Sequence, residues 1–558
     1  MRYDVCIVGS GAGAGPVAYE LSKAGYKVVV LEKGGWYEKE DFFKDEIGVC
    51  RRSTFTPTLD KEQHVLEEKV EGRWKGTPTS ESGWDFWNGN IVGGSSNFMS
   101  GYFHRMKPKD FSLKSEYAEI PGANIEDWPI SYEELEPYYA KVESIVGVSG
   151  RVVEHPFLEP RSTDDYPYKP TSEHIISSWF DKACKKNKLY SIPTARAVLS
   201  SDVGERRGCE YSGYCGSYGC SSGAKGSSRE ALLHKALKTG NCTILAKAFV
   251  KTLESDKSRV KSAHYIDKVG NTNEIKADIF VLAAQAIETS RLLLNSANTF
   301  FPRGLANNSN QVGKNLLFSA GGSGTGAFYY EDLSAQDADA LKTVGPFVNR
   351  SLQDWYEITD SSRPVKEKGG TIDFLFEHPN AVSRAKRAMY DGDLVWGDQL
   401  KKRLLHNFKQ RRIFTFEIFC DWTPNDDCFV SLDEEVKDRW NMPVAKVRLG
   451  AHPHDLRIGE HMAKEAEHLL KQMGAREVSS SISASPPQNL QAGGCRFGND
   501  ANSSVLNKEC RAHEVDNLYI SDGSFMPTGG SVPFTWTIYA NSFRVADAII
   551  RELEKGKR

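Results

Sequence analysis

The N-terminal segment constrains the fold of this chain more than any other. Residues 3–8 form a short apolar run typical of a buried strand, and residues 9–15 read GSGAGAG. A helical pattern follows over residues 16–24, and residues 27–31 (KVVVL) indicate a second strand that ends at Glu32. A strand, a glycine-rich turn, a helix and a second strand in this register predict a βαβ unit.

The small residues of this unit have separate structural roles. Gly9 permits the tight strand-to-helix turn, Gly11 lets the backbone approach a pyrophosphate, and Ala14 lets the helix pack closely on the strand. The helix N-terminus offers free N–H groups and the positive end of the helix dipole to phosphates. Glu32 is placed to accept hydrogen bonds from a ribose. The sequence therefore predicts a bound dinucleotide.

Length and composition exclude several classes of protein. The 558 residues are too many for one simple core, so we expect two or more domains. A net charge of -3 gives no basic surface for nucleic acid, and no apolar run reaches the about 18–20 residues that span a bilayer. Because the first strand starts at residue 3, we expect no signal peptide. The eleven scattered cysteines do not resemble a secreted disulfide framework, which favours reduced thiols.

The remaining elements indicate a discontinuous domain. We expect a helix within residues 130–148, where Ser131 and Glu134 form a capping box. Strands are expected at 241–250, 260–267 and 274–284, and strand-like stretches at 412–419, 428–432 and 444–449. A helix is expected near 454–473, and a strand followed by a long helix at 517–550. Since both chain ends look nucleotide-binding, a second domain is inserted between them.

Four separated blocks resemble the GMC (glucose–methanol–choline) oxidoreductases, which use FAD. They are the N-terminal unit, VGGSSN at 92–97, AAQAIETSRLLL at 283–294 and the segment from CRFGND at 495 to the C-terminal helix. The pattern is most similar to bacterial gluconate, fructose and sugar dehydrogenase flavoprotein subunits. The resemblance implies an α/β fold, in which a Rossmann-type FAD-binding domain is built from both chain ends and the inserted substrate domain has an antiparallel sheet plus helices. The expected boundaries are 1–325 (including a Cys-rich loop at 205–228), 326–485 and 486–558.

The resemblance also implies roles for residues outside the N-terminal unit. Three small or polar residues would lie along the flavin, two apolar residues near the adenosine, and an Asp-Gly pair near the pyrophosphate and ribityl chain. These are Gly93, Gly94 and Asn97; Val250 and Ala284; and Asp522 and Gly523.

The sequence departs from the family at the proton-handling positions. The family usually has a His three residues before the first Gly of a segment like GGCRFG, and a His or Asn in the last block. Here these positions are Leu490 and Pro533, and neither side chain can move a proton.

Three explanations remain open. The base is displaced, with a His from the inserted domain, such as His452 or His454, taking the proton. Alternatively, the reaction needs no strong base, as for a lactol, or ordinary alcohol oxidation has been lost. Taken singly, each His is expected to be structural or at the surface. In the first case three polar side chains orient the substrate: Asn489, Gln491 and Asn541.

A cysteine cluster is the second feature with chemical content. Cys209, Cys215 and Cys220 lie within twelve residues, interleaved with glycines that permit tight turns. Thiolates at such spacing suit zinc or an iron–sulfur cluster, and three ligands would match a [3Fe-4S] cluster, as in similar sugar dehydrogenases. The alternatives are a metal-free loop, as in other family members, and a disulfide.

The expected function is FAD-dependent dehydrogenation of a CH–OH group of a sugar, sugar acid or polyol, with a non-oxygen acceptor. An oxidase, a lyase- or isomerase-like flavoprotein and a non-catalytic FAD-stabilised subunit are the alternatives. Expected partners are the substrate, a small Tat-signal-bearing subunit and a cytochrome, with cytoplasmic residence or co-export to the periplasm. Five aromatic residues either stack on a sugar ring or belong to the core: Trp84, Phe86, Trp87, Phe534 and Trp536.

Overall fold

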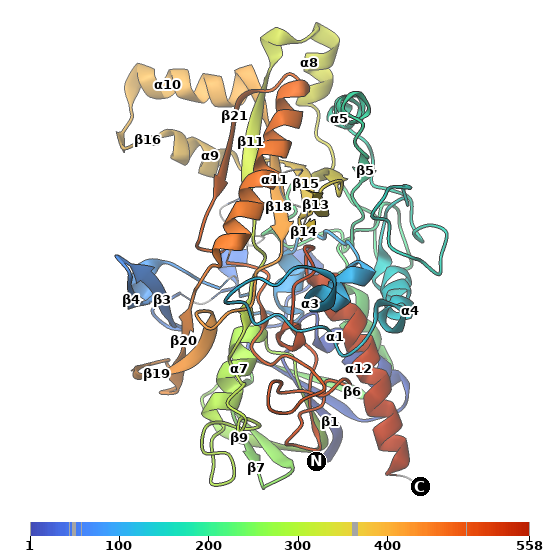
Figure 1. Cartoon of the computed structure of the whole chain (residues 1–558), viewed down its shortest axis with the longest axis vertical. Helices are drawn as coiled ribbons and strands as arrows, with labels where there is room; N and C mark the ends of the chain where they lie inside the picture. Colours follow the sequence, from blue (N-terminus) through green and yellow to red (C-terminus); the bar gives the residue numbers. More distant parts are fainter. Residues whose placement is uncertain are drawn as a thin grey trace.

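The computed structural model describes residues 2–43, 45–46, 52–56, 58–86, 88–359, 366–486 and 488–556. Trp87, one of the five aromatic residues considered above, lies outside this set. Two large sheets lie at opposite ends of an elongated body (Figure 1). In the part of the chain described, no helix is long and apolar enough to cross a membrane.

The first sheet is assembled from both ends of the chain, as predicted. Its order is β6 (Cys242–Ala246), β2 (Val28–Glu32), β1 (Arg2–Val8), β9 (Thr272–Leu282), β8 (Val260–Ile266) and β7 (Phe249–Ser255). The C-terminal strand β23 (Leu518–Ile520) pairs in parallel with the end of β9. Helix α1 (Ala14–Lys23) packs against α12 (Thr535–Lys555), so the two chain ends share one core (Figure 1).

The second sheet is antiparallel and carries helices, in agreement with the predicted substrate domain. Its order is β21 (Arg476–Ile482), β11 (Gly322–Tyr329), β18 (Arg411–Cys420), β15 (Gly370–Phe376), β12 (Val348–Leu352) and β5 (Ile192–Pro193). Helix α11 (Pro453–Gln472) packs on this sheet through its apolar face, and α5 (Ile175–Asn187) packs on β12. Because β5 comes from the preceding segment, the sheet is not confined to residues 326–485, and the domain boundaries stay a prediction.

A third, four-stranded sheet joins distant parts of the chain. Its order is β19 (Phe429–Lys437), β20 (Pro443–Arg448), β3 (Val65–Val70) and β4 (Arg73–Pro78), and the pairing of β20 with β3 joins the two hairpins. The predicted capping box is confirmed, since the Ser131 side chain accepts from the Glu134 backbone N–H and starts α4 (Tyr132–Val142). The other elements are α2 (Thr79–Ser82), α3 (Leu113–Glu116), α6 (His234–Lys238), α7 (Ala286–Asn295), α8 (Ala335–Lys342), α9 (Ala381–Ala388), α10 (Gly397–Leu405), β10 (Leu316–Leu317), β13 (Glu357–Thr359), β14 (Lys366–Lys368), β16 (Tyr390–Asp391), β17 (Asp393–Leu394) and β22 (Ala492–Gly493).

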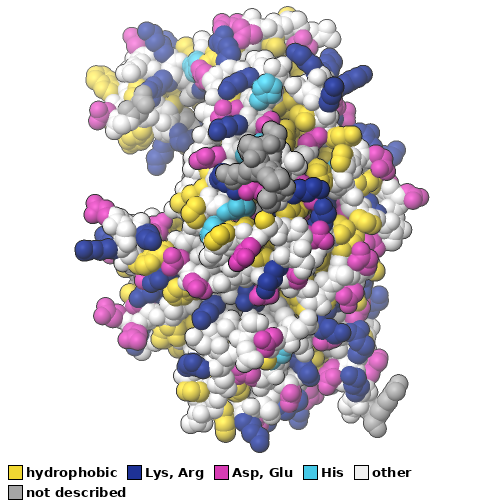
Figure 2. Space-filling model, in the orientation of Figure 1, with side chains coloured by type: hydrophobic (Ala, Val, Ile, Leu, Met, Phe, Trp, Pro, Cys, Tyr) yellow, Lys and Arg dark blue, Asp and Glu magenta, His cyan; other side chains and the backbone are white. Residues whose placement is uncertain are grey.

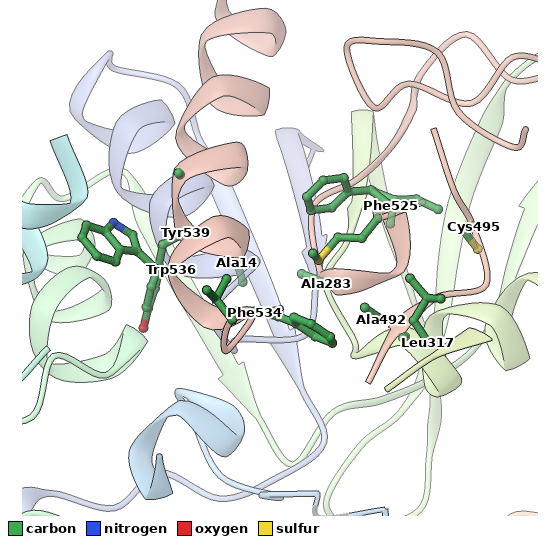
Figure 3. Close-up of a cluster of buried hydrophobic side chains, with 14 of the residues drawn as sticks. Ala14, Ala283, Leu317, Ala492, Cys495, Phe525, Phe534, Trp536 and Tyr539 are labelled. Carbon is green, nitrogen blue, oxygen red and sulfur yellow. The ribbon is translucent and has the colours of Figure 1, made fainter. Parts of the chain in front are cut away.

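The core beneath the first sheet draws on segments far apart in sequence. Figure 3 shows Ala14, Ala283 and Phe534 close to one another, with Trp536 and Tyr539 on the adjoining helix α12. Trp536 is fully buried and therefore belongs to the core rather than to a sugar-stacking surface. On the face shown in Figure 2, positive and negative side chains are interspersed, as the small net charge suggests.

Candidate active site

A cavity of about 360 Å³ connects the first sheet with the second. One end is formed by the turn between β1 and α1, the end of β2 and the start of α7. The other end is formed by residues 99–102, by the Cys-rich loop at 216–217, and by side chains of β18. Residues 489–491, 522–523 and 533–535 lie between the two, so both chain ends meet the inserted sheet here.

The glycines of the first turn form a backbone cradle at one end of the cavity. Gly9 has φ +95°, and a Cβ there would lie 2.2 Å from the Ala283 carbonyl oxygen. A Cβ on Gly13 would lie 2.7 Å from the Asp522 backbone nitrogen. A Cβ on Gly11, by contrast, would meet no atom within 4 Å, so Gly11 leaves space open toward the cavity. A pyrophosphate needs this combination of tight turn and open backbone.

Two buried carboxylates are fixed beside this cradle. Glu32 Oε2 accepts from Ser10 Oγ at 2.5 Å and Oε1 accepts from the Gly34 N–H at 2.7 Å. Asp522 Oδ2 accepts from the Gln285 N–H at 3.1 Å. Burial raises the pKa of both carboxyls, but these donors favour the charged forms. Both line the cavity, where they can accept further bonds from hydroxyl groups.

Most of the predicted cofactor residues line the cavity: Gly9, Gly11, Glu32, Gly94, Val250, Ala284, Asp522 and Gly523. Ala14, Gly93 and Asn97 are not among the residues that line the cavity, and their expected places near the cofactor stay a prediction. The Asn97 amide instead donates to the Val92 and Gly94 carbonyls at 3.1 and 2.9 Å, and a Cβ on Gly93 would lie 2.6 Å from Asn97 Nδ2. These residues shape the turn that presents Gly94.

The opposite end of the cavity carries a half-buried acid. Glu417 on β18 lines the cavity, and the Tyr102 hydroxyl donates to its Oε2 at 2.8 Å. Burial raises the pKa of Glu417 to about 7, and the nearby Asp373 adds to the rise. His378 lines the same region, with its ring stacked on Phe347 at a centroid distance of 4.3 Å.

A second, fully buried acid lies behind Glu417. Asp373 on β15 is the direct cross-strand partner of Glu417 on β18. Both carboxylate oxygens of Asp373 lie 3.1 Å from His104 Nε2, and Thr194 Oγ1 donates to Oδ1 at 3.3 Å. The Ser351 hydroxyl also donates to Oδ1. Residues directly opposite in an antiparallel pair extend to the same face of the sheet, so the two acids lie side by side.

Comparison with known proteins identifies the family. The two GMC oxidoreductase models, N-terminal and C-terminal, match residues 76–319 and 424–542. The chain belongs to the GMC oxidoreductase family. As a GMC oxidoreductase, it is an FAD-dependent enzyme that acts on CH–OH groups. The structure fits this cofactor, since the glycine cradle, Glu32 and the start of α7 lie along one end of the cavity.

The relatives of this GMC oxidoreductase cover nearly its whole length. It is 29% identical to 2-methyl-1,2-propanediol dehydrogenase of Mycolicibacterium austroafricanum, over 98% of this chain and 95% of the relative. It is 28% identical to paromamine 6'-oxidase of Streptomyces fradiae (99% and 92%) and 26% identical to the fructose dehydrogenase large subunit of Gluconobacter japonicus (99% and 98%). A formate oxidase structure has the same fold, with a TM-score of 0.66 at 14% identity, over 99% of each chain.

The positions that normally handle protons in GMC oxidoreductases lie at the cavity. Leu490 and Pro533 both line it, and Leu490 packs against the hydrophobic cluster formed by Tyr102, Phe347, Val348, Leu375 and Phe419. The same cluster contains Tyr102, whose hydroxyl binds Glu417. Glu417, the acid that Tyr102 contacts, was not singled out by the sequence analysis.

The polar residues expected to orient substrate have different locations. Asn489 and Gln491 line the cavity, and the Gln491 amide donates to the Phe86 carbonyl at 2.7 Å. Asn541 does not line the cavity, because it is fully buried in α12 with Nδ2 3.3 Å from Cys510 Sγ. The expected place of Asn541 in the site is thus not supported.

The two histidines proposed as a displaced base lie elsewhere. His452 caps α11 with Nδ1, and its Nε2 lies 3.0 Å from the Pro121 carbonyl oxygen. His454 lies next to Asp455 and Glu367, with nitrogen–oxygen distances of 3.6 and 4.0 Å. Neither lines the cavity. A base from this part of the inserted domain is therefore not supported.

The Cys-rich loop contributes to the cavity wall through Gly216 and Ser217. Cys209, Cys215 and Cys220 form no disulfide. In the described part of the chain, their sulfur atoms are not all within 4.8 Å of one another, as ligands of one zinc ion would be. Burial raises the pKa of the Cys209 thiol, and Cys215 adds to the rise. The Arg196 guanidinium donates to Cys215 Sγ at 2.9 Å, which favours a thiolate.

Proposed function

We propose that this GMC oxidoreductase is a dehydrogenase for a sugar, sugar acid or polyol that delivers electrons to an acceptor other than dioxygen. The observation that carries the proposal is the continuous cavity, which joins the dinucleotide cradle to a polar pocket with Tyr102, His378, Glu417 and Asn489. Hydroxyl-rich substrates need several such donors and acceptors in one pocket. The names of the diol and fructose dehydrogenase relatives support this substrate class.

The residues of the cradle would hold FAD, which when bound supplies the acceptor for two electrons and a hydrogen from the substrate carbon. Gly11 and the N-terminus of α1 would receive the pyrophosphate, and Glu32 the ribose hydroxyls. Gly94 and Gly523 would allow the ring system to approach the backbone. The protein itself orients the alcohol and excludes water.

Anaerobic titration of the purified flavoprotein tests this function. Addition of a sugar, sugar acid or polyol should bleach the oxidised flavin band, and an artificial electron acceptor should restore the colour. A panel that includes a vicinal diol, fructose, gluconate and an aminoglycoside would separate substrate classes. Absence of bleaching with every alcohol in the panel would contradict the proposal.

An oxidase is the second candidate function. Two relatives at 28% identity carry oxidase names, paromamine 6'-oxidase and 6'''-hydroxyparomomycin C oxidase of Streptomyces lividus. Mixing the substrate-reduced enzyme with air-saturated buffer decides between the two. A dehydrogenase should reoxidise slowly in air and rapidly with a quinone or cytochrome, whereas an oxidase should reoxidise rapidly in air and release hydrogen peroxide.

The three-cysteine loop supports a finer proposal, a [3Fe-4S] cluster held by Cys209, Cys215 and Cys220. Such a cluster holds its thiolates farther apart than a single ion does, and Gly216 and Ser217 place this loop at the cavity wall. Iron and sulfide analysis after anaerobic purification, with an EPR spectrum, tests it. Three iron atoms per chain that are lost in Cys215→Ser would support the cluster, and iron-free protein would contradict it.

A cluster would direct electrons to a protein acceptor. We therefore propose a cytochrome and a small signal-bearing subunit as partners, with co-export to the periplasm, and cytoplasmic residence as the alternative. The name of one relative, the fructose dehydrogenase large subunit, supports assembly with other chains. Co-purification of tagged protein with the products of neighbouring genes tests the partners, and fractionation of the cell tests the compartment.

A further inference from the structure

The two positions where GMC oxidoreductases usually place proton-handling residues are Leu490 and Pro533, so the proton of the alcohol needs another acceptor. At the end of the cavity remote from the glycine cradle, the ionisable side chains that line it among the described residues are Tyr102, His378 and Glu417. Of these, Glu417 carries a carboxylate at the cavity wall that accepts a hydrogen bond from the Tyr102 hydroxyl at 2.8 Å, and its pKa, which burial raises to about 7, suits a base that takes up a proton near neutral pH.

We infer that Glu417 is the general base that takes the hydroxyl proton of the substrate, and that Asp373, held by His104, is a positioning residue behind it. The inference rests on the proposed function. It explains how the enzyme works with Leu490 and Pro533 at the usual positions. The Leu490 side chain packs against the cluster that contains Tyr102, whose hydroxyl binds Glu417. The Glu417 carboxyl, which belongs to the second sheet, therefore takes the place of the missing His side chain.

The proton and electron balance of the step is simple. The O–H bond of the substrate breaks, and its proton forms a new O–H bond on a Glu417 carboxylate oxygen. The carbinol carbon loses its hydrogen together with two electrons to the acceptor that FAD supplies, and the C–O bond becomes a carbonyl. The protonated Glu417 then releases its proton to solvent, since its side chain is partly exposed to the cavity.

The surroundings of Glu417 tune it for this step. Tyr102 donates a hydrogen bond that favours the carboxylate and lowers the pKa of Glu417, whereas the Asp373 charge on the adjacent strand raises it. On the other side of β18, the cross-strand partner is the uncharged Ser323 of β11. The remaining charged or titratable groups nearby are His378 at the cavity wall, His104 on Asp373 and the buried Arg196, which donates to the Ser100 carbonyl.

Asp373 is fully buried and accepts from three different side chains, which fixes it without a contact to the cavity. It can therefore act on the reaction only through Glu417. Its negative charge opposes ionisation of Glu417, so removal of that charge should lower the pKa of Glu417. A merely structural role for Asp373 would change stability without moving the pH dependence of the reaction.

The decisive variants are Glu417→Gln, which keeps the shape of the side chain, and Glu434→Gln as a matched control at an exposed position of β19. Stopped-flow bleaching of the FAD-loaded enzyme by an oxidisable polyol should be slower by roughly 10²–10⁴-fold in Glu417→Gln and unchanged in the control. Infrared difference spectra between pH 5 and 9 give a readout independent of activity. A protonated-carboxyl band should titrate near pH 7, vanish in Glu417→Gln and shift to lower pH in Asp373→Asn.

The outcomes separate the inference from the proposed function. If wild-type enzyme oxidises the polyol and Glu417→Gln bleaches equally fast, or if the carboxyl band persists in that variant, Glu417 is not the base and the function still stands. If no alcohol reduces the wild-type enzyme, the proposed function fails and the base role with it. If Asp373→Asn folds but leaves the carboxyl titration in place, the positioning role is wrong.

Discussion

The Tyr102 hydroxyl lies 2.8 Å from Glu417 Oε2 and donates to it, which joins a loop beside the first sheet to the middle strand of the second. The contact lies at the cavity, and Leu490, at the usual histidine position, packs against the hydrophobic cluster that contains Tyr102. This one bond links the two halves of the site. Because this bond affects the pKa of Glu417, its removal should change the pH dependence of the enzyme.

Replacement of Tyr102 by Phe should move the pH profile upward. The hydrogen bond from Tyr102 stabilises the Glu417 carboxylate, so its loss should raise the pKa of Glu417 above about 7. Since a base must be deprotonated to act, the acid limb of kcat/KM should move to higher pH by roughly one unit, which corresponds to about 1.4 kcal/mol. If the acid limb of kcat/KM stayed at the same pH and only the maximal value fell, the substitution would have changed packing rather than the pKa of Glu417.

Glu417 should also make the protein less stable at high pH. A carboxyl whose pKa is raised in the folded state from about 4.3 contributes stability below pH 4, and this contribution is lost as pH rises through about 7. Glu417→Gln should therefore be more stable than wild type at pH 8 by about 1–3 kcal/mol, after allowance for solvent in the cavity. Urea unfolding at pH 5 and 8 measures this. If the variant and wild type had the same free energy of unfolding at both pH values, burial would impose no penalty on the charged Glu417 side chain.

Two glycines of the first turn should respond differently to the same substitution. A Cβ on Gly11 meets no protein atom within 4 Å, so Gly11→Ala should fold normally and bind FAD roughly five- to a hundredfold more weakly. A Cβ on Gly9 collides with the Ala283 carbonyl at φ +95°, so Gly9→Ala should lower the yield of folded protein. The flavin-to-protein absorbance ratio and circular dichroism measure the two effects. Full FAD occupancy in Gly11→Ala would exclude Gly11 from the pyrophosphate site.

Arg105 should be the strongest single anchor of the loop that carries Tyr102 and His104. Its fully buried guanidinium donates to Glu143 at 2.6 and 2.9 Å and to Glu136 at 2.8 Å. Arg105→Met leaves these acids without that partner and should reduce the free energy of unfolding by about 3–5 kcal/mol. The control Arg2→Met, which breaks the exposed pair with Asp278, should cost less than about 1 kcal/mol. Denaturant unfolding of both variants gives the comparison, and equal losses would contradict it.

The cofactor half of the site could be predicted from sequence because its chemistry is local. Gly9, Gly11 and Glu32 lie within one βαβ unit, where turn geometry and strand register place them without knowledge of the rest of the chain. Gly93 and Asn97 belong to the same turn as Gly94 but do not line the cavity, because a motif does not say which residues of a turn face it. Their expected place along the flavin stays a prediction. The contact of the Asn541 amide with Cys510 could not be predicted either, because helix periodicity does not give the partner of a side chain.

The substrate half could not be predicted because its residues meet only through tertiary contacts. Tyr102 and Glu417 are 315 positions apart, and Asp373 reaches Glu417 through the pairing of β15 with β18. One signal was present: Glu417 interrupts the apolar run FTFEIFC in a predicted strand. A carboxylate between buried Phe416 and Ile418 costs folding free energy unless it has a partner or a function. Glu417 has Tyr102 as its partner and is the base that we propose.

We propose that this GMC oxidoreductase removes hydride from a CH–OH carbon at the Glu417 end of the cavity. Anaerobic stopped-flow bleaching of the bound flavin by a polyol, compared with the same polyol deuterated at its carbinol carbons, tests it most directly. Bleaching should be severalfold slower with the deuterated substrate, and the colour should recover when an artificial acceptor is added. Bleaching that is insensitive to deuterium, or no bleaching with any alcohol by fully FAD-loaded enzyme, would contradict it.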